Sequence, residues 1–238
     1  MIRIRRAAPA DVADIGSVVR HVWGQEILPE VCLVQIADDT GAVWVAEERG
    51  HVAGFACACA TLSAAKQRRW EIDLVAVRPS CEGRGVGSRL IRRASRDGAR
   101  RGVAVVRALV RVSNLPGQRA FRRAGFTTDH RRYHLLLWSP ESAQMQTPSL
   151  DGVTLVPVDT LTYRGLWIEG LAHVGPGEQR AVVAAARATI ARDGRLNTGA
   201  LIEAEREYLL AAELRAQAEM HGEYYWFVKP VSAAGREA

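Results

Sequence analysis

The chain contains few cysteines, and they form no pattern that would hold a metal or a disulfide framework. Among 238 residues there are four, without a Cys-x-x-Cys pair and without a clustered histidine: Cys32, Cys57, Cys59 and Cys81. A metal site is therefore not expected. No run of about 18 apolar residues occurs, so no membrane-spanning helix is expected either, and no apolar stretch follows the charged N-terminus. These absences predict a cytoplasmic protein with reduced thiols.

Lysine is also scarce. Of the 32 basic residues only Lys66 and Lys229 are lysines, and with 26 acidic residues the net charge is +6. Arginine suits bidentate contacts with phosphate, and a basic protein suits an anionic ligand. The same arginine- and alanine-rich usage is typical of a GC-rich genome, which we expect to explain the larger part of it. The hydrophobic fraction of 48% is that of an ordinary globular protein.

Residues 70 to 126 contain the strongest pattern in the chain. Trp70 to Val77 alternates and is rich in Val, Leu and Ile, which predicts a strand. Apolar residues recur at helical spacing from Leu90, which predicts a helix that begins near Gly87 or Ser88. Between the two, glycines let backbone N–H groups approach a phosphate closely, and the helix dipole adds a partial positive charge. The strand, the glycine-rich turn and the helix together predict an anion-binding turn.

Other interpretations of these glycines are less specific or do not fit. A plain strand-to-helix connection would also use glycine. The dinucleotide-binding motif requires G-x-G-x-x-G, whereas Gly83, Gly85 and Gly87 alternate here, and the Walker A loop requires a lysine that this turn lacks. Neither phosphate-binding motif fits.

The turn resembles the signature of the GNAT superfamily of acyl-CoA N-acyltransferases, which is Arg/Gln-x-x-Gly-x-Gly/Ala after a strand ending Val-x-Pro. The chain has Val77-Arg78-Pro79 and then Glu82-Gly83-Arg84-Gly85-Val86-Gly87. A second stretch, from Asn114 to Phe126, is similar to the family's Asn-x-x-Ala-x-x-x-Tyr-x-x-x-Gly-Phe. The resemblance covers residues 1 to 138. It implies a fold of the α/β class (α+β), in which helices flank a mixed sheet that is splayed at its centre. It also implies that acetyl-CoA is the acyl donor.

The resemblance also implies which residues bind acetyl-CoA: Val75, Ala76, Val77, Glu82, Gly83, Arg84, Gly85, Val86, Gly87, Ser88, Asn114 and Phe121. Two of them depart from the family pattern. Glu82 stands where the family prefers Arg or Gln, so weaker CoA binding is expected, with Arg84 and Arg89 available to compensate. Phe121 stands where many members have the tyrosine that protonates the departing thiolate, and phenylalanine cannot donate a proton.

Two carboxylates on the predicted central strand are candidates for the catalytic base. Glu71 and Asp73 are two residues apart, so they share one face of the strand, and an amine must lose its proton before it attacks a thioester. Buried carboxylates are costly unless they are hydrogen-bonded or functional, and their proximity should raise the apparent pKa of the pair. The alternative is a strand end in solvent, where both carboxylates pair with Arg68 or Arg69.

Three further groups would complete the site. The family's oxyanion donor is a backbone N–H on this strand, here near Val75 or Ala76. Asn114 would bind the pantetheine arm or a bridging water. Tyr133 is the candidate for the missing acid, although a thiolate leaves without one because the pKa of its thiol is near 8.5.

The chain is expected to divide into a GNAT domain over residues 1–138, a linker over 139–152 rich in Pro, Ser and Thr, and a C-terminal helix-rich segment over 153–238 with one or two strands. The expected helices of that segment are Glu178–Arg192 and Ala200–Met220, and Tyr224–Val228 is an expected strand. Val153–Val158 followed by Asp159 loosely resembles the opening strand and helix of the chain, so a degenerate half-GNAT is one interpretation. We expect the segment to pack on the first domain or on a second subunit.

These observations predict an acetyl-CoA-dependent N-acetyltransferase for the primary amine of a small molecule. Two alternatives remain open: a non-catalytic acyl-CoA-binding or regulatory protein, suggested by Glu82 and Phe121, and an acetyltransferase for protein or aminoacyl-tRNA amines, suggested by the basic charge. No membrane partner is expected, and nucleic acid is not the favoured partner because an arginine-studded helix is usually a solvated face. A homodimer through the last strand is one of two docking modes left open.

Overall fold

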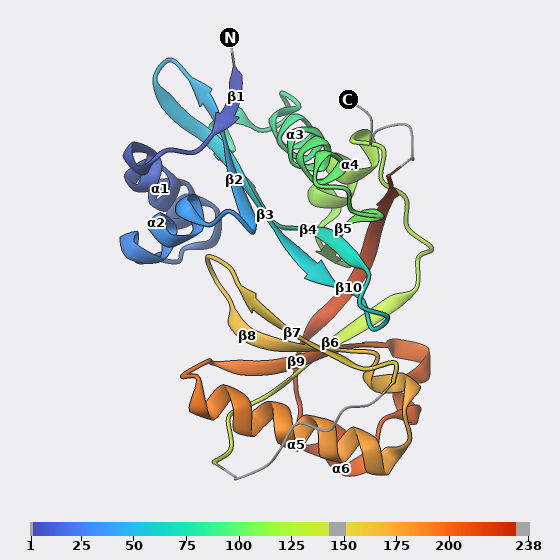
Figure 1. The fold of residues 1–238 in the computed structure, drawn as a ribbon. Helices are drawn as coiled ribbons and strands as arrows, with labels where there is room; N and C mark the ends of the chain where they lie inside the picture. The colour runs from blue at the N-terminus through green and yellow to red at the C-terminus, as the bar shows by residue number, and fades with distance from the viewer. Residues whose placement is uncertain (1, 143–150, 232–238) are drawn as a thin grey trace.

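The computed structural model describes residues 2–142 and 151–231, so part of the predicted linker lies outside the described residues. A single mixed sheet runs through both parts of the chain in the order β1-β2-β3-β4-β5-β10-β6-β9-β8-β7 (Figure 1). A mixed sheet flanked by helices was predicted, and that fold class is confirmed.

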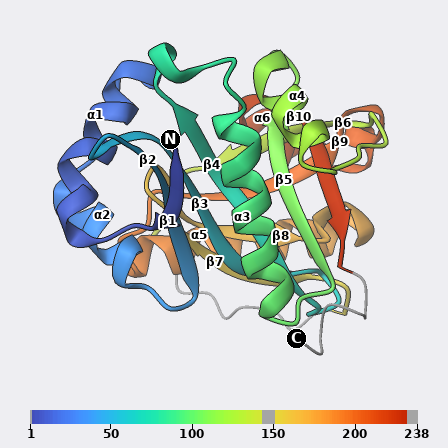
Figure 2. The ribbon, with the colours of Figure 1, turned by 90° about the horizontal axis from the view of Figure 1, so that it is seen from above.

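The first part of the chain contains six strands and four helices. They are β1 (Arg3–Arg6), α1 (Val12–Trp23), α2 (Pro29–Ala37), β2 (Gly41–Glu48), β3 (His51–Leu62), β4 (Arg68–Val77), α3 (Val86–Arg100), β5 (Val105–Arg111), α4 (Leu115–Arg123) and β6 (Arg132–Trp138). α3 begins at Val86, slightly earlier than predicted. Figure 2 shows α1 and α2 beside β1 and β2, with α3 lying over the middle of the sheet. α1 and α3 pack on opposite faces of β2, β3 and β4.

The second part contains β7 (Thr154–Asp159), β8 (Arg164–Glu169), α5 (Pro176–Arg192), β9 (Asn197–Glu203), α6 (Ala212–Gln217) and β10 (Glu219–Pro230). Two sequence predictions were wrong here. Among the described residues, four strands occur instead of one or two. The predicted helix Ala200–Met220 contains the end of β9, the short α6 and the start of β10. The loose likeness of Val153–Asp159 to the opening strand and helix of the chain ends at Asp159, because a second strand, β8, follows β7.

Alternating burial explains why the stretch after residue 197 forms a strand despite its helical propensity. Ala200 and Ile202 are buried in the cluster under α5, whereas Leu201 packs on the other face against Leu135 and Leu137. Tertiary packing of both faces therefore outweighs the helix preference of Ala, Leu and Glu.

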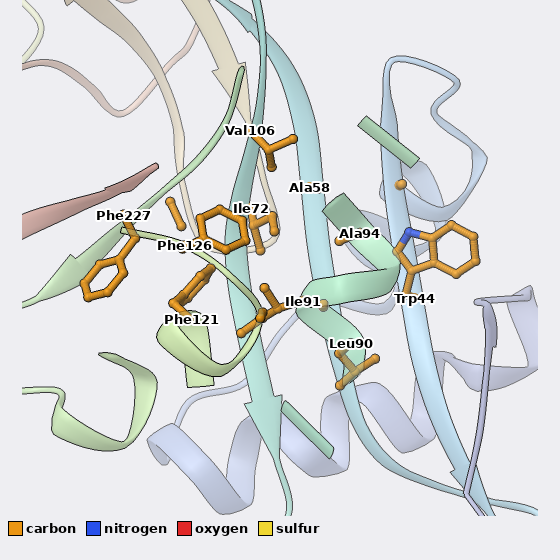
Figure 3. Packing of buried hydrophobic residues seen from close by; sticks show 14 of the residues in the cluster. Trp44, Ala58, Ile72, Leu90, Ile91, Ala94, Val106, Phe121, Phe126 and Phe227 are labelled. Atoms are coloured by element: carbon orange, nitrogen blue, oxygen red, sulfur yellow. The ribbon is translucent and has the colours of Figure 1, made fainter. Parts of the chain in front are cut away.

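The last strand, β10, lies inside the sheet. It pairs antiparallel with β5 from Tyr224 to Pro230 and with β6 from Glu219 to Tyr225. Its Phe227 is fully buried in the core of the first part, beside Phe121 (Figure 3). Because both edges of β10 are used within the chain, this strand does not provide the edge for the dimer that the sequence left open.

The two parts repeat one order of elements. β3, β4, α3, β5, α4 and β6 correspond to β7, β8, α5, β9, α6 and β10, and in both parts the central pair is parallel over three residue pairs. β5 pairs with β10 of the second part, and β9 pairs with β6 of the first part. Each part therefore completes the sheet of the other with its last strand.

α3 is held tightly against the central strand. A Cβ atom at Gly98 would lie 2.5 Å from Trp70 Cδ1, so only glycine allows this approach. The buried Trp70 Nε1 donates to Ala94 O at 3.1 Å. Ile72, Leu90 and other apolar side chains fill the space between helix and sheet (Figure 3). This packing holds the C-terminal half of α3 against the start of β4, and at the other end a Cβ atom at Gly87 would lie 3.7 Å from Val77 Cγ2. No helix among the described residues is long and apolar enough to cross a membrane.

Candidate active site

The sheet opens between β4 and β5. Their ladder consists of Arg69↔Val105, Trp70↔Val106 and Glu71↔Arg107, and it stops there. Arg78 N donates to Ala53 O on the other side of β4 at 2.8 Å. Since N–H directions alternate along a strand, Ala76 N also faces β3, whereas the N–H groups of Val75 and Val77 face the open side. Of the two amides that the sequence offered as oxyanion donors, only that of Val75 is directed into the gap.

Asp73 is the extra residue of a β-bulge in β4. Cys57 pairs with Leu74 and Ala58 pairs with Ile72, which leaves Asp73 without a partner residue on β3. Bulges redirect side chains and are frequent beside active sites. Asp73 is solvent-exposed at the point where β4 leaves β5.

The environment of Asp73 favours its protonated form more than water does. Protein atoms surround the carboxyl group on most sides and raise its pKa to about 6, while a hydrogen bond from Thr160 lowers it and the nearby Glu71 raises it further. Asp73 is thus reached by solvent, although protein atoms lie around much of its carboxyl group. A carboxylate with this pKa is suited to accept a proton near neutral pH.

Glu71 is held in a buried cluster of four charges. Its Oε1 accepts from Arg107 Nε and from Thr61 Oγ1, both at 2.7 Å. Glu169 on β8 accepts from Arg107 Nη2 at 2.8 Å and lies 2.7 Å from Arg69 Nη2. Burial alone would raise the pKa of Glu169, but Arg107 and Arg69 hold it below its usual value. The cluster, which we call the four-charge cluster (Arg69, Glu71, Arg107, Glu169), joins β4 and β5 to β8.

The glycine-rich turn has the geometry of an anion-binding turn. Gly83 and Gly85 have φ values of +71° and +75°, which favour glycine. Within the described residues, no side chain caps the N-terminus of α3, so its first N–H groups can bind a ligand. At the corresponding start of α5, Glu178 accepts from Gly175 N at 2.9 Å, so a carboxylate lies beside that helix N-terminus. α3 has no acidic residue in its first turn, which leaves its first N–H groups open to an anion.

The arginines expected to compensate for Glu82 are directed elsewhere. Arg84 Nη1 donates to Glu48 Oε2 at 2.8 Å, and Arg89 Nη2 donates to Ile2 O at 2.6 Å. Ser88 Oγ donates to Gly85 O at 3.0 Å and so stabilises the turn. Backbone amides and the helix dipole therefore provide most of the positive potential at this turn.

Asn114 and Phe121 support α4. Asn114 Oδ1 accepts from Gly117 N at 2.9 Å and caps the helix. Phe121 is 5% exposed and packs edge-to-face on Phe126, with ring centroids 5.2 Å apart. The structure thus places Phe121 in the core under the gap, where it offers no proton.

Tyr133 lies on β6, paired with Tyr224 and Glu203. Burial raises the pKa of its phenol above the usual value, and the positive charge of the nearby Arg131 opposes this shift only in part.

The loop between β7 and β8 reaches the site from the second part of the chain. Its Leu161 is 6% exposed and joins the cluster of Ile15, Val18 and Cys32 under α1 and α2. Gln35 Nε2 on α2 donates to Asp159 O at 3.0 Å. Sequence reasoning missed Thr160, Arg107 and Glu169, because no motif marks them and their roles arise from pairing across distant segments.

Residues 14–126 match the family described as the acetyltransferase (GNAT) family. A GCN5-related N-acetyltransferase from Sphaerobacter thermophilus is similar, with 16% identity, a TM-score of 0.55, and coverage of 97% of this chain and 96% of that chain. A GCN5-related glucosamine N-acetyltransferase region of a fungal multi-domain β-N-acetylglucosaminidase has 11% identity and a TM-score of 0.61 over 96% of this chain and 38% of that chain.

Arabidopsis thaliana NAA60, solved with a bisubstrate analogue, has 19% identity and a TM-score of 0.50 over 56% of this chain and 87% of that chain. No curated protein matches the chain. The open β4–β5 pair, the uncapped glycine-rich turn and the family match agree with one another, and the chain therefore carries an N-acetyltransferase domain of the GNAT family over residues 14–126.

Proposed function

We propose that the protein transfers an acetyl group from acetyl-CoA to the primary amine of a small molecule, with Asp73 as the general base. The observation that carries the proposal is the position of Asp73. It is the bulged residue of β4, exposed where the sheet opens, and it lies two residues before the Val75 N–H that faces the gap.

The residues present fit acetyl-CoA. The N–H groups of residues 83–88 would hold the diphosphate, and the open edges of β4 and β5 would hold the pantetheine arm. Bound acetyl-CoA supplies a thioester as the acyl donor. The Val75 N–H would donate to the thioester oxygen as negative charge develops there. Asp73 would take the proton of the acceptor ammonium, and Tyr133 or water would return a proton to the thiolate.

Asp73 is preferred to Glu71 because of their partners. Glu71 Oε1 already accepts from an arginine and a threonine inside the four-charge cluster, so this carboxylate is committed to the cluster. Asp73 pairs with no arginine or lysine within the described residues, and the protein atoms around its carboxyl group raise its pKa to about 6.

A small acceptor is supported by the β7–β8 loop. It is fastened to α2 through Leu161 and the Gln35–Asp159 hydrogen bond, so the side of the site near Asp73 is bounded by two segments. The fungal glucosamine N-acetyltransferase region, which is similar in fold, is named for a small amine acceptor.

The substitution Asp73→Asn tests the base. We expect kcat to fall by about 10²- to 10³-fold with little change in CoA affinity, measured by thiol release with a panel of amines and by calorimetry. In the unchanged protein, activity should rise with pH through about 6 as Asp73 loses its proton.

Asp193→Asn, at the exposed end of α5, is the matched control and should leave both quantities unchanged. Wild-type rates in Asp73→Asn across pH 6 to 9 would remove Asp73 as the base. CoA binding without turnover of any amine by the unchanged protein would favour the non-catalytic alternative.

A second candidate function, acetylation of an amine carried by a nucleic acid, is favoured by one observation. On the β1 side of α3 a groove of 510 Å³ is lined by Ile4, Arg89, Arg92, Arg93 and Arg96. The one acidic residue of α3, Asp97, pairs with Arg6 and Arg101 instead. Arginines without carboxylate partners can bind phosphates.

We expect Arg92→Ala/Arg96→Ala to weaken any binding of a single-stranded RNA and to reduce its salt dependence, with CoA affinity unchanged. Fluorescence anisotropy over a salt series measures this, and Arg192→Ala on α5 is the control. RNA affinity that is absent, or equal in all three proteins, would contradict the second candidate.

A further inference from the structure

The antiparallel pair β7 and β8, which we call the β7–β8 hairpin (residues 154–169), reaches the face of β4 opposite α3. Trp70 and Ile72 of β4 are buried in the core under α3. Because side chains alternate along a strand, Arg69 and Glu71 point to the other face. Glu169, at the end of β8, binds Arg69 there, with 2.7 Å between Glu169 Oε1 and Arg69 Nη2. The second part of the chain thus contacts the face of β4 that α3 leaves free.

The hairpin is attached to the first part of the chain at three places. At its start, Thr154 Oγ1 donates to Ala64 O, in the turn between β3 and β4, at 3.0 Å. At its tip, which lies near α2 (Figure 1), Leu161 is buried under α1 and α2, and Asp159 O accepts from Gln35 Nε2 at 3.0 Å. At the end of β8, the four-charge cluster joins the hairpin to β4 and β5. The hairpin is therefore held both at its open end and at its tip.

Glu169 is the one member of the four-charge cluster that comes from the second part. Its Oε1 accepts from Arg107 Nη2 at 2.8 Å. Arg107 in turn donates to Glu71, and its guanidinium carbon lies 3.8 Å from the centre of the Trp226 ring. Arg69 is 8% exposed, and charged hydrogen bonds that are shielded from water are stronger than those at the surface. Arg107 belongs to the last pair of the β4–β5 ladder, so Glu169 attaches the hairpin at the point where the sheet opens.

Asp73 can be reached only from the side of β4 on which the hairpin lies. On the other side, Ile72 of β4 and Val106 and Ala108 of β5 are buried in the core under α3. Leu74, directly after the bulge, packs in the cluster under α1 instead. Asp73 is exposed to solvent, and apolar side chains fill the α3 side. An amine that reaches Asp73 therefore arrives from the side of α1 and the hairpin.

We propose that Glu169 is a positioning residue for acceptor binding, because it joins Arg69 and Arg107 and so holds the β7–β8 hairpin as the wall against which the acceptor amine binds. This proposal rests on the function proposed above. Glu169 does not touch the substrates and acts through the hairpin. The proposal assigns part of acceptor recognition to a segment outside residues 14–126, which carry the family match.

The double substitution Arg69→Met/Glu169→Leu tests the attachment. It removes one charge of each sign, so Arg107 and Glu71 stay paired and no buried charge is left alone. We expect KM for the amine to rise about 10-fold, because binding must then order the hairpin as well, while kcat and the affinity for CoA, measured by calorimetry, stay unchanged. Amide hydrogen exchange of β8 should become faster. The milder variant Glu169→Gln keeps the size of the side chain and one acceptor oxygen, and should raise KM less.

Two variants control for other causes of a raised KM. Arg180→Met/Glu213→Leu makes the same two replacements at an exposed ion pair between α5 and α6, with its charged atoms 3.6 Å apart, and should change neither KM nor CoA affinity. Leu214→Ala, on α6, lowers the stability of the second part away from the three attachments and should also leave KM unchanged.

An unchanged KM for the amine, or unchanged exchange of the β8 amides, in every folded Glu169 variant overturns the proposal. An equal rise of KM in Leu214→Ala overturns it too, because the effect would then be one of stability. If the unchanged protein turns over no amine, the proposed function fails and this proposal fails with it. A failure of this proposal alone leaves the unchanged protein active, so the two failures are distinguishable.

Discussion

A chain shortened to end at Trp138 should not form a stable monomer. The shortened chain lacks β10, so β5 loses one of its two neighbours and β6 loses both. It also lacks Phe227, which is fully buried against Phe121. Removing one such side chain costs about 3 to 5 kcal/mol, against a total stability of about 5 to 15 kcal/mol for a domain. Loss of the whole strand should therefore abolish the cooperative thermal transition.

Circular dichroism on heating and gel filtration measure this outcome. The matched control is a chain that ends at Val231, which retains all strands of the described residues and should unfold at the temperature of the full chain. If the chain ending at Trp138 were soluble, monomeric and as thermally stable as the full chain, the second part would be an independent appendage and the role assigned to β10 would be wrong.

Gly85→Glu should abolish measurable CoA binding, with an affinity at least about 100-fold lower. Gly85 is in the left-handed region with φ +75°, directly before α3. A side chain there costs about 1 to 2 kcal/mol of backbone strain, and a carboxylate at the helix N-terminus occupies the place of the anion that those N–H groups would bind. Isothermal calorimetry with CoA measures the loss.

Gly102→Glu is the matched control, because it places the same side chain at the other end of the same helix. Gly102 has φ +69°, and a Cβ atom there would meet no other atom within 4 Å. The backbone strain is comparable, and the helix dipole disfavours a carboxylate at this end, so Gly102→Glu should lose at least as much stability as Gly85→Glu while it keeps its CoA affinity. Normal CoA affinity in a folded Gly85→Glu protein would remove the anion-binding turn from the proposed site.

The fold of the first part was accessible from sequence because its signals are local. Trp70–Val77 has strand alternation, the glycines mark a turn, and Leu90 begins a helical period, and all three occur close to where they were predicted. The stretch Ala200–Met220 was assigned to a helix because its propensity is helical, but its neighbours in the sheet decide its conformation. No local pattern in the sequence distinguishes a segment that follows its own propensity from one, such as Ala200–Met220, whose conformation is decided by its neighbours in the sheet.

The site was only partly accessible, for a related reason. Glu71 and Asp73 look equivalent in sequence, two residues apart on one strand. The bulge at Asp73 and the arginine on β5 separate them, and both depend on residues of other strands, Cys57 and Ala58 on β3 and Arg107 on β5. Thr160 lies 87 residues after Asp73 and has no motif of its own. Pairing across distant segments is not encoded in spacing, so the assignment of the base remains a prediction for the variants above.

The exchange of last strands has a consequence for the order of events during synthesis. β6 is complete at Trp138, but its neighbours β9 and β10 begin only at Asn197 and Glu219. At about 5 to 20 residues per second, the ribosome needs several seconds to produce them. During that interval the first part exposes the edges of β5 and β6 and the apolar surface that Phe227 later covers. The nascent chain should therefore depend on chaperone protection until its final strand emerges.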